Sequence, residues 1–176
     1  MTLIVEDGSI VAGAESYCTV AFATTYHSNI GNAAWAALAS DTVREQCLRK
    51  ATAYMVQAYR KRWAGYRYNA TTQVLDWPRA YCPLPDAIAG YGSFQAYVPI
   101  NTVPIEIKNA CADLALTAAT STLLADTTQQ ITKETIGPIS TEYDVNSPQV
   151  TQYRSIDAML KIYFNTGSSL EHRLVR

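Results

Sequence analysis

The chain has 176 residues, of which 48% are hydrophobic and 16% are charged. These values are typical of one globular domain with its own core, and they exclude a collagen-like, a coiled-coil or an intrinsically disordered protein. The formal net charge is only −1, yet residues 1–43 carry −4 and residues 44–79 carry +6, so a neutral average conceals a basic middle segment.

Two short helical segments are expected between residues 16 and 38, on either side of a break at Gly31, and the second is centred on Trp35. A longer amphipathic helix is predicted over residues 40–60, because apolar residues recur there at steps of three and four and Ser40 or Asp41 can cap the first turn. The apolar positions of this helix are Val43, Cys47, Leu48, Ala51, Tyr54, Met55, Ala58 and Tyr59.

Residues 61–103 do not continue the helical pattern, because glycine and proline interrupt every long run. A loop of this length is usually functional or disordered, and its aromatic content is too high for a disordered linker. We therefore expect an ordered loop that packs against its own domain or against a partner. Its aromatic residues are Trp63, Tyr66, Tyr68, Trp77, Tyr81, Tyr91, Phe94 and Tyr97.

A second strong helix is predicted to begin at Pro104, since proline is well tolerated in a first helical turn. Residues 131–145 then form two runs separated by Gly137 and Pro138, and the residues of 139–145 alternate with period two, which predicts a small β-hairpin or extended arm over 131–145. Helical spacing returns before a C-terminal arm over residues 165–176. The predicted fold is mainly α: one domain over residues 1–164, with a bundle of about four helices, the long loop and the hairpin.

The residue types that catalytic and metal sites require are sparse. The four cysteines lie far apart without a CxxC pair, so we expect reduced, mostly buried thiols and neither a zinc site nor a disulfide framework. Only His27 and His172 could serve as an imidazole base, and no nucleotide-binding, hydrolase or metalloprotease motif is present. We therefore expect no enzymatic activity, and no catalytic, metal-binding or cofactor-binding residues.

Two further exclusions concern the compartment. No run approaches eighteen apolar residues, so membrane insertion is not expected. The start MTLIVEDGSI has acidic residues where a secretory signal needs basic ones, so an intracellular setting is expected.

The most specific internal pattern is the element WAGYR at residues 63–67 followed by QVLDWPR at residues 73–79. Two interpretations of it stay open. The tryptophans and arginines can hold the long loop on the helices, or they can contact single-stranded nucleic acid by stacking and by binding phosphate. The basic residues of the middle segment are likewise either paired with acids elsewhere in the fold or free to meet a phosphate or an acidic partner.

Several blocks of the sequence occur in an order that resembles a family of tailed-bacteriophage virion proteins. These blocks are MTLIVEDGSIVAGAESYCTV at the start, WAAL at 35–38, WAGYR, QVLDWPR, VPIEIKNACADLAL at 103–116 and KETIGPISTEY at 133–143. The chain is similar to the head-to-tail connector adaptor, a family that also carries the label DnaT-like single-stranded DNA-binding protein. The resemblance covers nearly the whole chain, and it departs between Tyr81 and Val103 and in the C-terminal arm.

The resemblance implies a structural virion protein of the neck, assembled in the cytoplasm of the bacterial host. It implies a homo-oligomeric ring, most often dodecameric, that binds below the portal protein and above the stopper or tail-tube proteins. Double-stranded DNA would pass through the channel of this ring during genome ejection. An acidic first segment and a basic middle segment suit the unlike faces that neighbouring subunits present in a ring.

Interface positions are predicted from the aromatic and arginine residues of the long loop and from the apolar residues of the C-terminal arm. They are Trp63, Tyr66, Arg67, Trp77, Arg79, Tyr91, Phe94, Tyr97, Leu170 and Leu174. The predicted contacts with the DNA channel or with phosphate are Arg60, Lys61 and Arg62.

The alternative function is a replication accessory protein that binds single-stranded DNA. Arg60, Lys61, Arg62, Arg67 and Arg79 would then bind phosphate, and Trp63, Trp77 and Tyr68 would stack on bases. The net charge of −1 weighs against this alternative, because dedicated nucleic-acid-binding domains usually have a dominant basic field.

Overall fold

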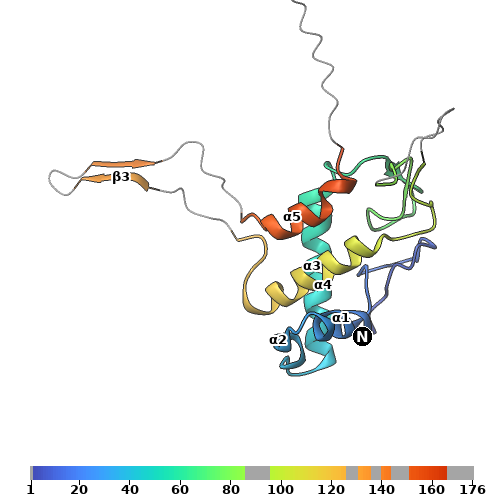
Figure 1. The fold of residues 1–176 in the computed structure, drawn as a ribbon, viewed down its shortest axis with the longest axis horizontal. Helices are drawn as coiled ribbons and strands as arrows, with labels where there is room; N and C mark the ends of the chain where they lie inside the picture. Colours follow the sequence, from blue (N-terminus) through green and yellow to red (C-terminus); the bar gives the residue numbers. More distant parts are fainter. Residues whose placement is uncertain (1, 86–95, 126–130, 136–139, 144–150, 166–176) are drawn as a thin grey trace, which may run out of the picture.

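A computed structural model describes residues 2–85, 96–125, 131–135, 140–143 and 151–165 of the chain (Figure 1). In the described ranges the protein is mainly α, as the sequence predicts, with two small antiparallel strand pairs, one of which is the predicted hairpin. Its elements are α1 (Val20–Asn29), α2 (Ala33–Ala36), α3 (Asp41–Tyr59), β1 (Tyr66–Arg67), β2 (Arg79–Ala80), α4 (Ile105–Thr120), β3 (Ile131–Thr135), β4 (Ser140–Tyr143), α5 (Arg154–Leu160) and a 3-10 helix, η1 (Lys161–Tyr163).

The core lies where α4 crosses α3, and α1 and α5 pack against α4 (Figure 1). Leu48, Ala51 and Met55 of α3 are fully buried, and so are Ile107 and Leu114 of α4. Alanines at positions 110, 112 and 115 of α4 are also fully buried, and small side chains let neighbouring helices approach closely. Helix α4 is therefore the central helix of the described body.

The helix termini follow the predicted capping. The side chain of Ser40 accepts a hydrogen bond from the backbone N–H of Val43 and so caps α3. Pro104 stands at the N-cap position of α4, where the missing N–H costs no intrahelical hydrogen bond. Gly31 has φ +72° between α1 and α2, which explains the predicted break.

A buried carboxylate organises the N-terminal segment. Glu6 is 1% exposed, and its two carboxylate oxygens accept hydrogen bonds of 2.9–3.0 Å from the backbone N–H groups of Gly8, Ile10 and Val11. These charge-assisted bonds satisfy the buried carboxylate and fix the turn that precedes α1. In the sequence, Glu6 is simply one of the four acidic residues of positions 1–43.

The predicted hairpin is also present. β3 and β4 are antiparallel and pair Thr135 with Ser140 and Glu134 with Thr141, with a register irregularity between Ile131 and Lys133. In Figure 1 this hairpin lies apart from the helices, and the main contacts of its two strands among the described elements are with each other.

All four cysteines are free and buried, as expected from their spacing. Among the described residues, no helix is both long and apolar enough to cross a bilayer. Leu170, Leu174, Tyr91 and Phe94 fall outside the described residues, as does most of the predicted C-terminal arm.

Candidate interaction surface of the loop layer

The described parts of the long loop, residues 61–85 and 96–103, form a layer over one end of the helical body, and we call it the loop layer (Figure 1). Its frame is the short antiparallel pair β1–β2, which places Tyr66 opposite Ala80 and Arg67 opposite Arg79. Gly65 precedes β1 with φ +66°, and a Cβ there would overlap the carbonyl oxygen of Ala80. This close approach explains why the WAGYR element needs glycine at its third position.

The two tryptophans of the loop layer lie inside the protein. Trp63 is 4% exposed and Trp77 is fully buried, and their rings meet edge to face with centroids 5.7 Å apart. Phe164 lies 5.2 Å from Trp63, and Tyr163 lies 5.4 Å from Trp77, so the end of the described C-terminal helix closes this aromatic cluster. The tryptophans therefore hold the loop on the body, and neither ring is open to a base or a partner in the described subunit.

Two arginines of the loop layer direct their guanidinium groups at main-chain carbonyls. Arg79 donates from Nε to the carbonyl of Ala64 at 2.8 Å and from Nη2 to that of Gly65 at 2.6 Å. Arg67 donates to the carbonyls of Gln73 and Ala70 at 3.0 and 3.1 Å. Both side chains thus satisfy backbone groups that the irregular loop leaves without a ladder partner.

The basic middle segment is also paired with acids of the same chain. Arg60 contacts Asp76 at 2.9 Å, Arg62 contacts Asp157 at 3.0 Å, and Arg49 of α3 contacts Glu15 at 2.9 Å. The acidic first segment and the basic middle segment therefore meet inside the subunit at Glu15 and Arg49. This pairing agrees with the interpretation that the basic residues form ion pairs with acidic residues elsewhere in the fold.

Asp76 is fully buried and lies at the centre of the loop layer. Its backbone N–H donates to the hydroxyl of Tyr17, and its Oδ1 accepts from Nε of Arg60. Burial raises the pKa of the Asp76 carboxyl, because the charged form loses its hydration, and Arg60 opposes that rise. Oδ2 of Asp76 has no hydrogen-bond partner among the described residues.

A basic hollow of about 470 Å³ lies where the first residues of the loop layer meet α5 and η1. Lys61, Arg62 and Lys161 line it together with Asp157 and the ring of Phe164. The guanidinium carbon of Arg62 stands 4.1 Å from the centroid of the Phe164 ring, which is a cation–π contact. Lys61 is exposed and no described residue pairs with it, so the hollow offers an ammonium group to an incoming anion.

Tyrosines supply the exposed aromatic part of the loop layer. Tyr66 is 73% exposed, Tyr68 50%, Tyr81 67% and Tyr97 45%. Tyr81 and Tyr97 also meet edge to face with centroids 5.7 Å apart, which fixes both rings at the surface. Rings presented in this way can stack on a base or anchor a protein interface.

The structure thus divides the predicted site residues into two groups. Trp63, Trp77, Arg67 and Arg79 support the loop from within, as the first of the two interpretations states. The residues at the surface are Tyr66, Tyr97, Arg60, Lys61 and Arg62, with Arg60 and Arg62 in ion pairs.

Sequence reasoning missed the contributions of Lys161 and Phe164 to this surface. Both follow α5 about a hundred residues after Lys61, and they are brought to the hollow by backbone hydrogen bonds from Ala64 to Tyr163 at 2.9 Å and from Asn165 to Arg62 at 2.7 Å. No local sequence pattern predicts such a long-range contact. An aromatic residue that follows a helical turn with a basic residue is the one signal that could have suggested this surface.

The described surface places cations beside aromatic rings, an arrangement that can contact a phosphodiester chain. Among the described residues there is no group of three or more potential metal ligands. No curated protein and no solved structure matched the chain. The family model described as putative DnaT-like ssDNA binding protein matches residues 1–176. Because this match spans the whole chain, the protein belongs to the DnaT-like ssDNA binding family.

Proposed function

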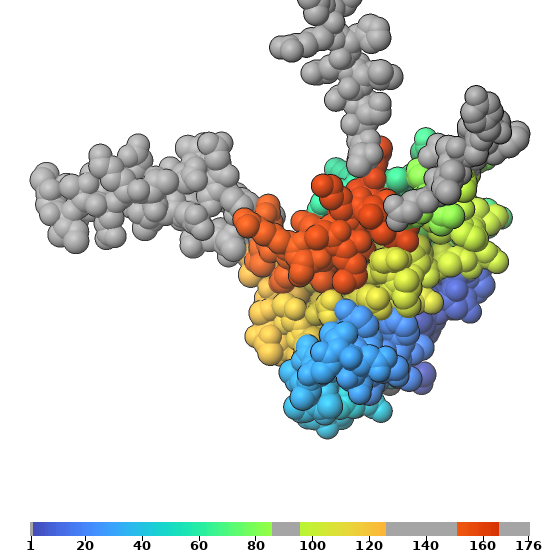
Figure 2. Space-filling model, in the orientation of Figure 1, coloured from blue at the N-terminus to red at the C-terminus, as the bar shows by residue number. Residues whose placement is uncertain are grey.

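We propose that this protein binds single-stranded DNA through the basic hollow and the exposed tyrosines of the loop layer. The observation that carries the proposal is the hollow that Lys61 and Arg62 line together with the Phe164 ring. In Figure 2 the last described segment of the chain, in red, lies beside the green part of the loop layer. Membership of the DnaT-like family supports it. The role is one of contact, and no chemical turnover is proposed.

The basic and the aromatic side chains would contribute to binding in different ways. The ammonium groups of Lys61 and Lys161 bind phosphate and release condensed counterions. Tyrosine rings stack on bases, and stacking tolerates any sequence because every base has a π-face. The net charge of −1 means that binding depends on this local surface and weakens steeply with salt.

Fluorescence anisotropy with a labelled oligothymidylate at low salt tests the proposal. The variant Lys61→Ala is expected to weaken binding and to lower the slope of log K against log salt by about 1, since one phosphate contact is lost. Lys50→Ala is the matched control, because Lys50 is an exposed lysine on α3 outside the hollow. Absence of binding at low salt, or equal effects of the two variants, would contradict the proposal.

A second candidate function is the virion head-to-tail connector, for which the hairpin β3–β4 is the supporting observation. A two-stranded sheet is marginally stable by itself in water, and this one lies apart from its own helices (Figure 1). A neighbouring subunit or a ring partner would cover such a hairpin. In this function the chain forms a homo-oligomeric ring between the portal and the stopper or tail-tube proteins, around the double-stranded DNA.

Electron microscopy of the protein mixed with the portal of the same phage tests this second function. An added ring below the portal, in the absence of any oligonucleotide, would favour the connector. Salt-sensitive binding of oligothymidylate by a protein that adds no density to portals would favour the DNA-binding function. The two experiments use different partners, so each candidate can fail separately.

A further inference from the structure

The guanidinium group of Arg62 is held in place at the basic hollow. Its Nη1 donates to Oδ1 of Asp157 at 3.0 Å, and its central carbon lies 4.1 Å from the ring centroid of Phe164 and 5.2 Å from that of Tyr59. The side chain is nevertheless 45% exposed, so an anion in the hollow can reach it. Arg62 therefore lines the space that a phosphate would enter and already has a carboxylate partner.

Asp157 is the one acidic residue among the described residues that line the hollow. Its side chain is 32% exposed, and it lies on α5 one helical turn before Lys161. Residues four apart share a face of a helix, so the carboxylate and the Lys161 side chain lie on the same side of α5. With three basic residues and one acidic residue, the lining of the hollow has a formal charge of +2.

A carboxylate in this position opposes anion binding in two ways. It repels an incoming phosphate, because like charges at short range disfavour each other even near the protein surface. It also accepts from an N–H group of Arg62 that a short, charge-assisted bond to phosphate would use. The guanidinium is therefore available to a phosphate only when the ion pair with Asp157 opens.

We propose that Asp157 limits the affinity of the hollow for DNA by keeping Arg62 from the phosphate. In the wild-type protein Lys61 and Lys161 make the phosphate contacts, while Arg62 stays paired with Asp157. When the carboxylate is removed, Arg62 becomes a further phosphate contact. This inference rests on the proposed function, because it concerns the same hollow, and it makes Asp157 a residue that sets the affinity without itself binding DNA.

The variant Asp157→Asn tests this role by fluorescence anisotropy with labelled oligothymidylate at several salt concentrations. We expect binding about fivefold tighter at low salt, and a slope of log K against log salt that is steeper by about 1. Asparagine has nearly the same size as aspartate, so the change is chiefly one of charge. A purely structural role of the ion pair predicts the opposite sign, since its loss would loosen the hollow and weaken binding.

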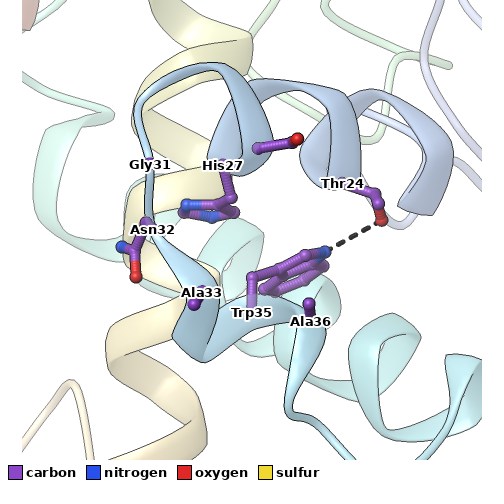
Figure 3. Close-up of a pocket in the computed structure, with 8 residues that line it drawn as sticks. Thr24, His27, Gly31, Asn32, Ala33, Trp35 and Ala36 are labelled. Atoms are coloured by element: carbon purple, nitrogen blue, oxygen red, sulfur yellow. Dashed lines mark hydrogen bonds between the residues drawn. The ribbon is translucent and has the colours of Figure 1, made fainter.

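Asp41→Asn is the matched control. It removes the same charge from an ion pair of the same kind, because Oδ1 of Asp41 lies 2.6 Å from Nη1 of Arg44 at the start of α3. Arg44 also donates to the carbonyl of Ala36, which lines a pocket at the corner between α1 and α2 (Figure 3). None of the described residues that line this pocket is a lysine or an arginine, and in Figure 1 the corner and the loop layer lie at opposite ends of the helical body. The affinity for oligothymidylate should therefore change little.

A double variant separates the release of Arg62 from the loss of one negative charge. Arg62→Gln in the Asp157→Asn background should abolish the added salt slope and most of the added affinity. Glutamine keeps part of the side-chain stem, so contact with Phe164 is partly retained. Persistence of the gain in the double variant, or an equal gain in Asp41→Asn, would overturn the competition for Arg62.

The wild type and Asp157→Asn together distinguish failure of this inference from failure of the proposed function. Clear binding by the wild type with unchanged or weaker binding by Asp157→Asn would overturn the role of Asp157 and leave the proposed function intact. Absence of binding by both proteins would overturn both. Binding by Asp157→Asn alone would support the limit that this carboxylate sets.

Discussion

Nε of Arg60 donates to Oδ1 of Asp76 at 2.9 Å, and this bond joins a half-exposed guanidinium to a fully buried carboxylate. Removal of the arginine leaves a buried charge without its partner, whereas the neighbouring Lys61 has no such partner to lose. We expect Arg60→Ala to lower the free energy of unfolding by about 2 kcal/mol and Lys61→Ala to change it by less than about 0.5 kcal/mol. Urea denaturation of both variants measures the difference. Equal losses of stability would show that the ion pair of Arg60 with Asp76 does not stabilise the fold.

The pH dependence of stability follows from the raised pKa of Asp76. Just above the ordinary value of 3.8, the folded protein holds more protons on this carboxyl than the unfolded chain does, and at higher pH both states release the proton. Since the folded state then binds more protons, its stability falls as pH rises through this window.

Asp76→Asn removes this titration and keeps an acceptor for Arg60. We therefore expect the free energy of unfolding of the wild type, minus that of Asp76→Asn, to become more negative as pH rises above 3.8. Asp113, whose pKa burial also raises, is present in both proteins and cancels in the difference. A difference that stays constant with pH would show that Asp76 titrates normally.

Trp77 and Tyr66 provide a second pair of contrasting substitutions. Trp77→Ala empties a fully buried site and is expected to cost about 3–5 kcal/mol of stability. Tyr66→Ala removes an exposed ring, so stability should change little while the affinity for oligothymidylate falls by about 1–3 kcal/mol. Thermal denaturation and anisotropy separate the two effects, and unchanged oligonucleotide affinity in Tyr66→Ala would exclude this ring as a stacking platform.

Gly65→Ala tests the close approach between β1 and β2. The new Cβ would overlap the carbonyl of Ala80, and the residue would keep a positive φ that alanine disfavours. We expect a loss of at least about 1 kcal/mol in urea denaturation. Gly31→Ala is an informative control, because Gly31 also has a positive φ but no atom stands within 4 Å of its Cβ position. A similar loss of stability in both variants would show that the positive φ, and not the overlap with the Ala80 carbonyl, is the cause.

Replacement of residues 131–143 by a glycine–serine linker tests the hairpin. Because β3 and β4 make their main described contacts with each other, the helical body should keep its free energy of unfolding within about 0.5 kcal/mol. If the hairpin is an assembly element, the variant should fail to join portal rings. A folded variant that still assembles would remove the hairpin from the connector hypothesis.

The helices could be predicted from the sequence because their signals are local. Ser40 as a cap, Gly31 as a break and Pro104 as a helix start each act within one turn. The roles of Trp77 and Arg79 could not be settled in this way, since an aromatic or basic residue in an irregular loop looks the same whether it faces solvent or the core. Trp77 packs against Tyr163, and Arg79 donates to the carbonyls of Ala64 and Gly65, so both roles depend on contacts outside the local pattern.

The buried side chain of His27 shows the same limit of prediction from sequence. The sequence marks His27 only as a rare residue type, because its engaged nitrogen meets the carbonyl of Ala112 on a helix that lies far away in the chain. Glu6 was missed for a different reason: a single acidic residue near a glycine does not reveal that its carboxylate accepts from the backbone N–H groups of Gly8, Ile10 and Val11.

The hydrogen bonds of Arg67 and Arg79 have a consequence for the rate at which an anionic partner binds. With their donors on main-chain carbonyls, they keep their positive charge but cannot form the short forked contacts that hold a phosphate in place. Such charges attract a polyanion from a distance and contribute little to its retention. Added salt should therefore slow the capture of an anionic partner by this end of the molecule more than it speeds its escape.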